Sequence, residues 1–172
     1  SFYKQESLSA LASLPVPLNI VSFLMRPILY FAYGSNMNLD QMAMRCPGAE
    51  LGPVGRLHGW KYFINGDGYA GIERAEGSEV LGCLWSLKEK HWRALDHYEG
   101  VAGGHYERIE LDVEQVALGV TVLCWVYLSC NHEYGVPDPR YQQIVMDGAR
   151  QVRLPADYLP VLECWANGCL DR

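Results

Sequence analysis

The order of apolar and polar positions predicts strands along most of this chain, with helices between them and near its end. From Arg108 to Val113 polar and apolar side chains alternate strictly, which predicts a half-exposed strand. The run from Thr121 to Leu128 is more continuously apolar and predicts a central strand. Apolar runs that meet Gly or Asn turns predict further strands at 29–33, 54–64 and 79–87, with a return that begins at Gly71-Ile72 after the turn at 65–68.

Capping residues mark the expected helices, because Asn, Asp and Ser side chains accept hydrogen bonds from the free N–H groups of a first helical turn. The expected helices run from Asn38 or Asp40 to Arg45, from the capping box Ser86–Glu89 to Gly100, from Asp138-Pro139 to about Gln151, and onward from Leu154-Pro155. Strands first and helices later, with a helix between strands, predict an α+β fold with a mixed, strongly curved sheet.

Composition limits the classes of function. The 172 residues are 49% hydrophobic, which is enough for one core and predicts a single domain. A net charge of −6, without any basic run, argues against nucleic acid or an anionic membrane as a partner. The cysteines are scattered, with neither a C-x-x-C pair nor zinc-type Cys/His spacing, so we expect a reduced, cytoplasmic protein without a metal.

Residues 1–24 read as an extension in front of a domain at 25–172. The stretch from Ser7 to Leu24 is uncharged, but Pro15 and Pro17 interrupt it, and Met25 resembles a natural start. We expect this extension to contribute nothing to an active site. Its apolar side chains should pack on the domain or on another copy of the chain, and the second arrangement would make the protein a homodimer.

Glu99 is the candidate for proton transfer. It follows a predicted helix, where the negative end of the helix dipole disfavours an anion, and an apolar pocket beside Tyr98 or Tyr106 would do the same. Its pKa would then rise toward neutrality, as suits a group that takes and returns a proton. The alternative is an ordinary solvated glutamate. Asp96, one turn earlier, is expected to lie at the surface.

The turn after the first strand is the candidate anion site. Backbone N–H groups of Tyr33–Asn36 could hold an oxyanion or a carboxylate, with Gly34 allowing close approach, although a simple turn would leave the same sequence pattern. Ser35 is a poor candidate nucleophile, because the chain has no G-x-S-x-G elbow and no histidine in a partner motif. Tyr141, in the first turn of a helix, could cover a ligand or simply pack.

Several ordered blocks resemble the gamma-glutamylcyclotransferase family, over about Ile28 to Leu162. They are the sequence Phe-Ala-Tyr-Gly-Ser-Asn at 31–36, Gly71-Ile72, Leu95-Asp96 with Glu99-Gly100-Val101, Tyr106, Pro139 with Tyr141, and Met146 with Gly148-Ala149. The resemblance implies a small, closed or nearly closed mixed β-barrel with peripheral helices, without a cofactor.

The resemblance also implies roles for individual residues. Glu99 would be the acid/base, and the substrate-binding residues would be Tyr30, Phe31, Ala32, Tyr33, Gly34, Ser35, Asn36, Tyr106 and Tyr141. The α-amine of a γ-glutamyl group would attack its own γ-amide carbonyl, closing 5-oxoproline and releasing an amino acid. A γ-glutamylamine, glutathione or an acylated antibiotic intermediate are alternative substrates. A non-catalytic small-molecule-binding module and a hydrolase using Ser35 are alternatives of other classes.

Overall fold

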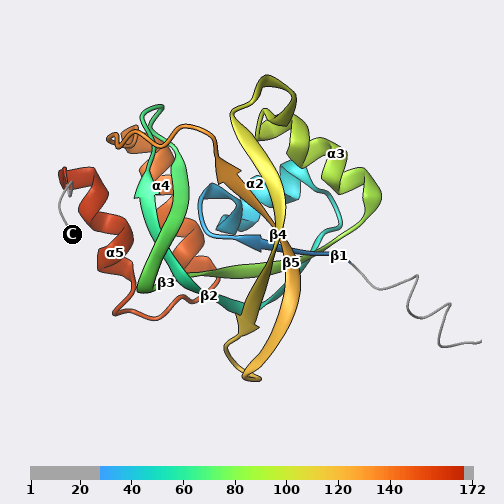
Figure 1. Ribbon diagram of the computed structural model, residues 1–172. Helices are drawn as coiled ribbons and strands as arrows, with labels where there is room; N and C mark the ends of the chain where they lie inside the picture. Colours follow the sequence, from blue (N-terminus) through green and yellow to red (C-terminus); the bar gives the residue numbers. More distant parts are fainter. Residues whose placement is uncertain (1–27, 169–172) are drawn as a thin grey trace, which may run out of the picture.

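The computed structural model describes residues 28–168 (Figure 1). Its centre is a closed barrel with the strand order β1-β3-β2-β4-β5. The strands are β1 (Ile28–Ala32), β2 (Glu50–Ile64), β3 (Ala70–Leu87), β4 (Tyr106–Gln115) and β5 (Val120–Ser129). Neighbouring strands are antiparallel except β1 and β5, which pair in parallel and make the barrel mixed. The predicted α+β fold with a small mixed barrel is confirmed.

Helices surround this barrel. They are α2 (Leu39–Arg45), α3 (Glu89–Tyr98), α4 (Pro139–Gln151) and α5 (Leu159–Glu163), with short 3-10 helices η1 (Ser35–Met37), η2 (Val101–Gly103) and η3 (Cys164–Asn167). Figure 1 shows α4 and α5 on one side of the barrel and α3 on the other. As predicted, the side chain of Asn38 caps α2 and that of Asp138 caps α4, each accepting a hydrogen bond from a first-turn N–H.

Two local predictions differ from the structure around β3. The return strand is continuous from Ala70 to Leu87, without a break before residue 79. The helix after it begins at Glu89 as expected, but its N-cap is Lys88 rather than Ser86. Ser86 pairs with Leu29 of β1 in the sheet, so its backbone is already committed to strand geometry. The ring Nδ1 of His91 instead accepts a hydrogen bond from the N–H of Lys88, at 3.1 Å.

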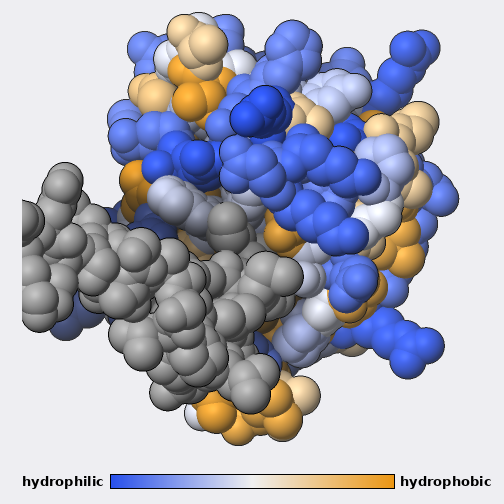
Figure 2. All heavy atoms as spheres, turned by 90° about the vertical axis from the view of Figure 1, so that its right-hand side faces the viewer, coloured by the Kyte–Doolittle hydropathy of each residue, from blue (hydrophilic) through white to orange (hydrophobic). Residues whose placement is uncertain are grey.

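The strand β5 is less buried than a continuously apolar run suggests. It lies between β4 and β1 as part of the closed barrel, and its inward residues Cys124 and Val126 are buried. Leu123, however, is 55% exposed, because side chains alternate across the wall of a barrel. Exposed apolar residues continue around the β4–β5 turn with Leu118 and Val120. Figure 2 shows a face whose upper part is mostly hydrophilic, with hydrophobic residues in several places that include its lower edge.

Close packing of α4 against η1 supports the segment that follows β1. A Cβ placed on Gly148 would lie 2.5 Å from the backbone nitrogen of Asn38, so only glycine allows this approach. The helix α4 therefore lies directly against the chain that leaves β1. The expected extension at 1–24 and the homodimer inferred from it fall outside the described residues. None of the helices in 28–168 is long and apolar enough to cross a membrane.

Candidate active site

Most of the predicted site residues meet in one cavity at the end of β1. Segments from several elements line it: Tyr30, Tyr33, Gly34, Ser35, Asn36, Ala70, Glu99, Tyr106, Tyr127 and Tyr141. The cavity and its open mouth hold about 290 Å³ of space between protein atoms. Phe31 and Ala32 are not among the lining residues, because both are fully buried in the barrel core. The backbone alternation of β1 turns Tyr30 toward the cavity and Phe31 away from it.

Glu99 is held inside this cavity rather than solvated. It is the C-cap residue of α3, where its N–H bonds the carbonyl of Leu95 at 2.8 Å. Its side chain is only 16% exposed. The carboxylate Oε1 accepts a hydrogen bond from Nδ2 of Asn36 at 2.9 Å and lies 3.8 Å from Nη1 of Arg45. An ordinary surface glutamate would have neither the burial nor these partners.

Burial raises the pKa of Glu99 above its usual value. The charge of Arg45 and the hydrogen bond from Asn36 both oppose that rise, since each favours the anion. The direction matches the expectation from the sequence, with Tyr106 among the surrounding rings. Tyr98 contributes differently, because it is 53% exposed and its ring lies against the guanidinium of Arg45, at 4.7 Å.

The side chain of Asn36 connects these groups. Its Nδ2 donates to the hydroxyl of Tyr30 and to Glu99, both at 2.9 Å. Its Oδ1 accepts from Nε2 of Gln41 at 3.2 Å and from Nη1 of Arg45 at 2.8 Å. The sequence pointed to the backbone amide of this residue, and nothing in the local pattern indicated that its side chain would bind the carboxylate 63 positions away.

The turn Gly34-Ser35 forms another part of the cavity wall. A Cβ on Gly34 would lie 2.8 Å from Cβ of Ala70 and 3.3 Å from the hydroxyl of Tyr141, so glycine is required by close approach. The first N–H groups of a short 3-10 helix have no partner within the turn, and η1 begins at Ser35. Ser35 faces the phenol of Tyr141 rather than a base.

Ala70 and Tyr127 line the cavity although the sequence indicated neither. The hydroxyl of Tyr127 donates to Oδ1 of Asp96 at 2.6 Å. Asp96 also accepts two hydrogen bonds from Nη1 of Arg108, at 3.0 and 3.1 Å. The side chain of Asp96 is 34% exposed, so it lies at the surface as expected, but its carboxylate is bound by two other side chains. Its carboxylate joins α3 to β4 and β5, one turn before Glu99.

A second, wider chamber opens from the first. It shares Ser35, Glu99, Tyr106 and Tyr141 with the inner cavity, and its outer wall includes Gln41, Arg45, Asp67, Tyr69, Tyr98 and His105. The empty space of this outer chamber, open solvent included, is about 1070 Å³. A substrate could thus place one end in the tyrosine-lined inner cavity and extend its other end toward solvent.

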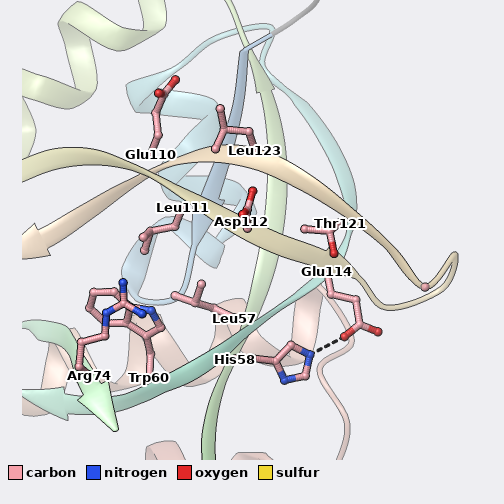
Figure 3. Close-up of a pocket in the computed structure, with 11 residues that line it drawn as sticks. Leu57, His58, Trp60, Arg74, Glu110, Leu111, Asp112, Glu114, Thr121 and Leu123 are labelled. Carbon is pink, nitrogen blue, oxygen red and sulfur yellow. Dashed lines mark hydrogen bonds and ion pairs between the residues drawn. The ribbon is translucent and has the colours of Figure 1, made fainter. Parts of the chain in front are cut away.

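A separate groove on the outside of the barrel lacks these features. Figure 3 shows it between β2 and the β4–β5 hairpin, with Glu110 and Asp112 among the residues that line it. Its Glu114 is already bonded to His58 at 2.6 Å and paired with Arg56 at 3.7 Å. No group of metal-ligating side chains gathers here or elsewhere in 28–168. The inner cavity is therefore the better candidate for chemistry.

A concave site that combines a few polar groups with a lining of aromatic rings is typical of proteins that bind small molecules. Residues 79–162 match a family model described as the AIG2-like family. Human (Homo sapiens) gamma-glutamylcyclotransferase is 36% identical over 140 residues, covering 76% of this chain and 74% of that protein. The mouse (Mus musculus) protein of the same name is 34% identical over the same shares.

A solved structure described as a gamma-glutamyl cyclotransferase superposes with a TM-score of 0.74 at 34% identity, covering 79% of this chain and 86% of that one. The chain belongs to the gamma-glutamylcyclotransferase family of enzymes. This membership agrees with the blocks found in the sequence, including the loop at 31–36 and Glu99-Gly100-Val101.

Proposed function

We propose that this protein converts a γ-glutamyl amino acid or peptide to 5-oxoproline and a free amino acid, with Glu99 as general acid and base. The observation that carries this proposal is the buried carboxylate of Glu99, held by Asn36 at 2.9 Å beside the Gly34-Ser35 turn. The names of the human and mouse relatives support the reaction class.

The proposed reaction balances with one proton carrier. The α-ammonium of the substrate gives a proton to Glu99, and the resulting amine attacks the γ-carbonyl carbon of the same glutamyl group. A new C–N bond closes the five-membered ring and places negative charge on the carbonyl oxygen. The ring nitrogen then carries one proton more than the lactam keeps. As the charge on the oxygen returns, the bond to the leaving nitrogen breaks and Glu99 delivers its proton to that nitrogen. Glu99 then takes the extra proton from the ring nitrogen and passes it to the released amine, which leaves as an ammonium ion. Glu99 ends as the anion that began the cycle.

The two chambers suit the two ends of such a substrate. The inner cavity is small and polar, so it would hold the glutamyl part, with N–H groups of the turn at Gly34–Asn36 near its carboxylate or oxyanion. The tyrosine rings would restrict the glutamyl chain to a folded conformer, which favours ring closure. The outer chamber would hold the leaving amino acid, because it continues from Glu99 toward solvent.

We also propose that the protein acts in the cytoplasm. Cys46, Cys83 and Cys124 are buried thiols without disulfide partners, which supports the reducing compartment inferred from the cysteine pattern. These thiols are also poor candidates for a catalytic nucleophile. Burial raises the pKa of the Cys46 thiol to about 11, so it stays protonated at neutral pH.

The direct test is incubation of the purified protein with γ-glutamyl dipeptides, glutathione and γ-glutamyl-lysine, with 5-oxoproline release as the readout. At least one γ-glutamyl dipeptide should yield 5-oxoproline and the free amino acid in equal amounts. Glutamate in place of 5-oxoproline would indicate hydrolysis and contradict cyclisation. No product from any member, while a γ-glutamyl dipeptide still binds, would support the non-catalytic binding module instead.

A further inference from the structure

Arg45 approaches the carboxylate of Glu99 without donating to it directly. Its Nη1 lies 3.8 Å from Oε1 of Glu99, beyond ordinary hydrogen-bond length, and 2.8 Å from Oδ1 of Asn36. The guanidinium also lies over the ring of Tyr98, whose centroid is 4.7 Å from its central carbon. Arg45 therefore has a fixed position at the edge of the site, between α2 and the end of α3.

The bond to Asn36 fixes which way its amide points. Nη1 of Arg45 and Nε2 of Gln41 are both donors, so they can bond only the carbonyl end of that amide. The amino end must then face Tyr30 and Glu99. A flipped amide would set two donors against Nδ2 and its own carbonyl oxygen against the carboxylate of Glu99, which is repulsive.

We propose that Arg45 is a positioning residue that orients Asn36 and keeps Glu99 ready to accept a proton when substrate binds. This inference rests on the proposed function only for its kinetic readout. Arg45 acts in two ways, through the Asn36 amide and through its own positive charge. The charge works in a site that is partly shielded from water, since the side chains of Arg45 and Glu99 are only 22% and 16% exposed.

The other groups that face Glu99 do not supply this charge. Phenols approach it from β1 (Tyr30), β4 (Tyr106), β5 (Tyr127) and α4 (Tyr141), and burial raises the pKa of each, so they stay neutral. The outer chamber adds the carboxyl group of Asp67 and the imidazole of His105. Among the described residues that line either chamber, Arg45 is the lone permanent cation.

The test is the pH dependence of kcat/KM with a γ-glutamyl dipeptide in Arg45→Met and Arg45→Gln. Both variants lose the charge, but glutamine keeps a donor for Asn36. The acidic limb reports the carboxylate of Glu99 in the free enzyme, and loss of a cation disfavours the anion. The limb should therefore move to higher pH by about one unit, a roughly tenfold loss of kcat/KM on its acidic side. Arg45→Lys keeps the positive charge, so its acidic limb should lie close to that of the parent.

A matched control variant accompanies these substitutions. Arg93→Met removes an arginine that is 82% exposed and should not move the limb. An unmoved limb in folded Arg45→Gln and Arg45→Met would overturn the proposal. A loss of kcat/KM that is equal at every pH would reduce Arg45 to a structural residue.

A second readout needs no turnover. Carbon-13 labelled glutamate allows NMR titration of the Glu99 carboxyl, and Glu99→Gln identifies its signal. Its midpoint should rise in Arg45→Gln relative to the parent. If the parent releases no 5-oxoproline, the proposed function is contradicted, but the titration still decides the role of Arg45. If the parent is active and the Glu99 midpoint is the same in Arg45→Gln as in the parent, only the role of Arg45 is contradicted.

Discussion

The hydroxyl of Tyr141 accepts a hydrogen bond from the backbone N–H of Ala70 at 3.0 Å, which joins the first turn of α4 to the first residue of β3. The carbonyl of the same alanine accepts from the hydroxyl of Tyr106, at 2.6 Å. Ala70 is only 3% exposed, so both of its polar backbone groups depend on tyrosines that line the cavity. Tyr141 is thus part of the cavity wall and of its support.

Tyr141→Phe should destabilise the fold and weaken substrate binding together. The ring remains, but the buried N–H of Ala70 loses its acceptor, which typically costs about 1–3 kcal/mol of unfolding free energy. Urea denaturation measures that loss, and KM for a γ-glutamyl dipeptide should rise. Tyr69→Phe is the matched control, because Tyr69 is 51% exposed and contacts Tyr141 edge-on through its ring. Equal stability of Tyr141→Phe and the parent would contradict this account.

The sequence predicts those features that depend on neighbouring residues. The caps at Asn38 and Asp138 lie within a few positions of the N–H groups that they bind, and both are present in the structure. Glu99 and the turn at 33–36 could be found because each belongs to a short, ordered block. A sequence block does not show which way each side chain points. The pleat of β1 buries Phe31 in the core although it directly follows the cavity residue Tyr30.

Long-range partners could not be predicted from such patterns. Asp96 of α3 binds Arg108 of β4 and Tyr127 of β5, and nothing near it in the sequence indicates these partners. The hydrogen bond between the Asn36 amide and Glu99 could not be predicted either, because its partners are 63 positions apart in the chain. A charged residue on a helix is usually a solvated one, so the expectation for Asp96 followed the common case.

Glu99→Gln should keep the fold and lose most of the turnover. The amide preserves shape and can still accept from Asn36, but it cannot shuttle a proton. A general acid and base typically contributes about a hundred- to ten-thousand-fold. Release of 5-oxoproline measures the effect, and Glu89→Gln, on the same helix with a side chain 80% exposed, should retain parental activity. Activity of Glu99→Gln within about threefold of the parent would remove Glu99 from the proposed role.

Ser35→Ala should retain substantial activity, because a wall of backbone N–H groups survives the loss of a hydroxyl. The phenol of Tyr141 next to Ser35 cannot act as its base, since burial raises the pKa of Tyr141 to about 12. Mass spectrometry of the enzyme during turnover should find no acylated serine. A covalent acyl-Ser35 species, with activity abolished in Ser35→Ala, would favour the hydrolase alternative.

Asp96→Ala should lower stability and turnover although Asp96 does not line the inner cavity. Arg108 lies between the rings of Trp92 and Trp125, at 5.0 and 4.7 Å from their centroids, and would lose its carboxylate partner. The side chains of Asp96 and Arg108 are about a third exposed, so the expected loss of unfolding free energy is modest, roughly 1–2 kcal/mol. Asp112→Ala, on the exposed face of β4, should change neither stability nor kcat.

The last prediction follows from the buried carboxylate of Glu99. Burial raises its pKa above the usual 4.5, so the folded protein holds this proton more tightly than the unfolded chain does. The stabilisation from the protonated form is complete below 4.5 and is lost as the pH rises through the raised pKa. Glutamine never carries that charge. Glu99→Gln should therefore unfold at a higher temperature than the parent near neutral pH, with a smaller difference below 4.5.

Thermal unfolding at a series of pH values measures this difference, and Glu89→Gln should show none of it because its carboxylate is exposed. An equal Tm difference at every pH would mean that the charge of Glu99 is not responsible. A second test uses Arg45, because its positive charge offsets part of the rise in the Glu99 pKa that burial causes. In an Arg45→Gln background the same Glu99→Gln change should stabilise the protein more at neutral pH, because the anion then has no opposing charge beside it.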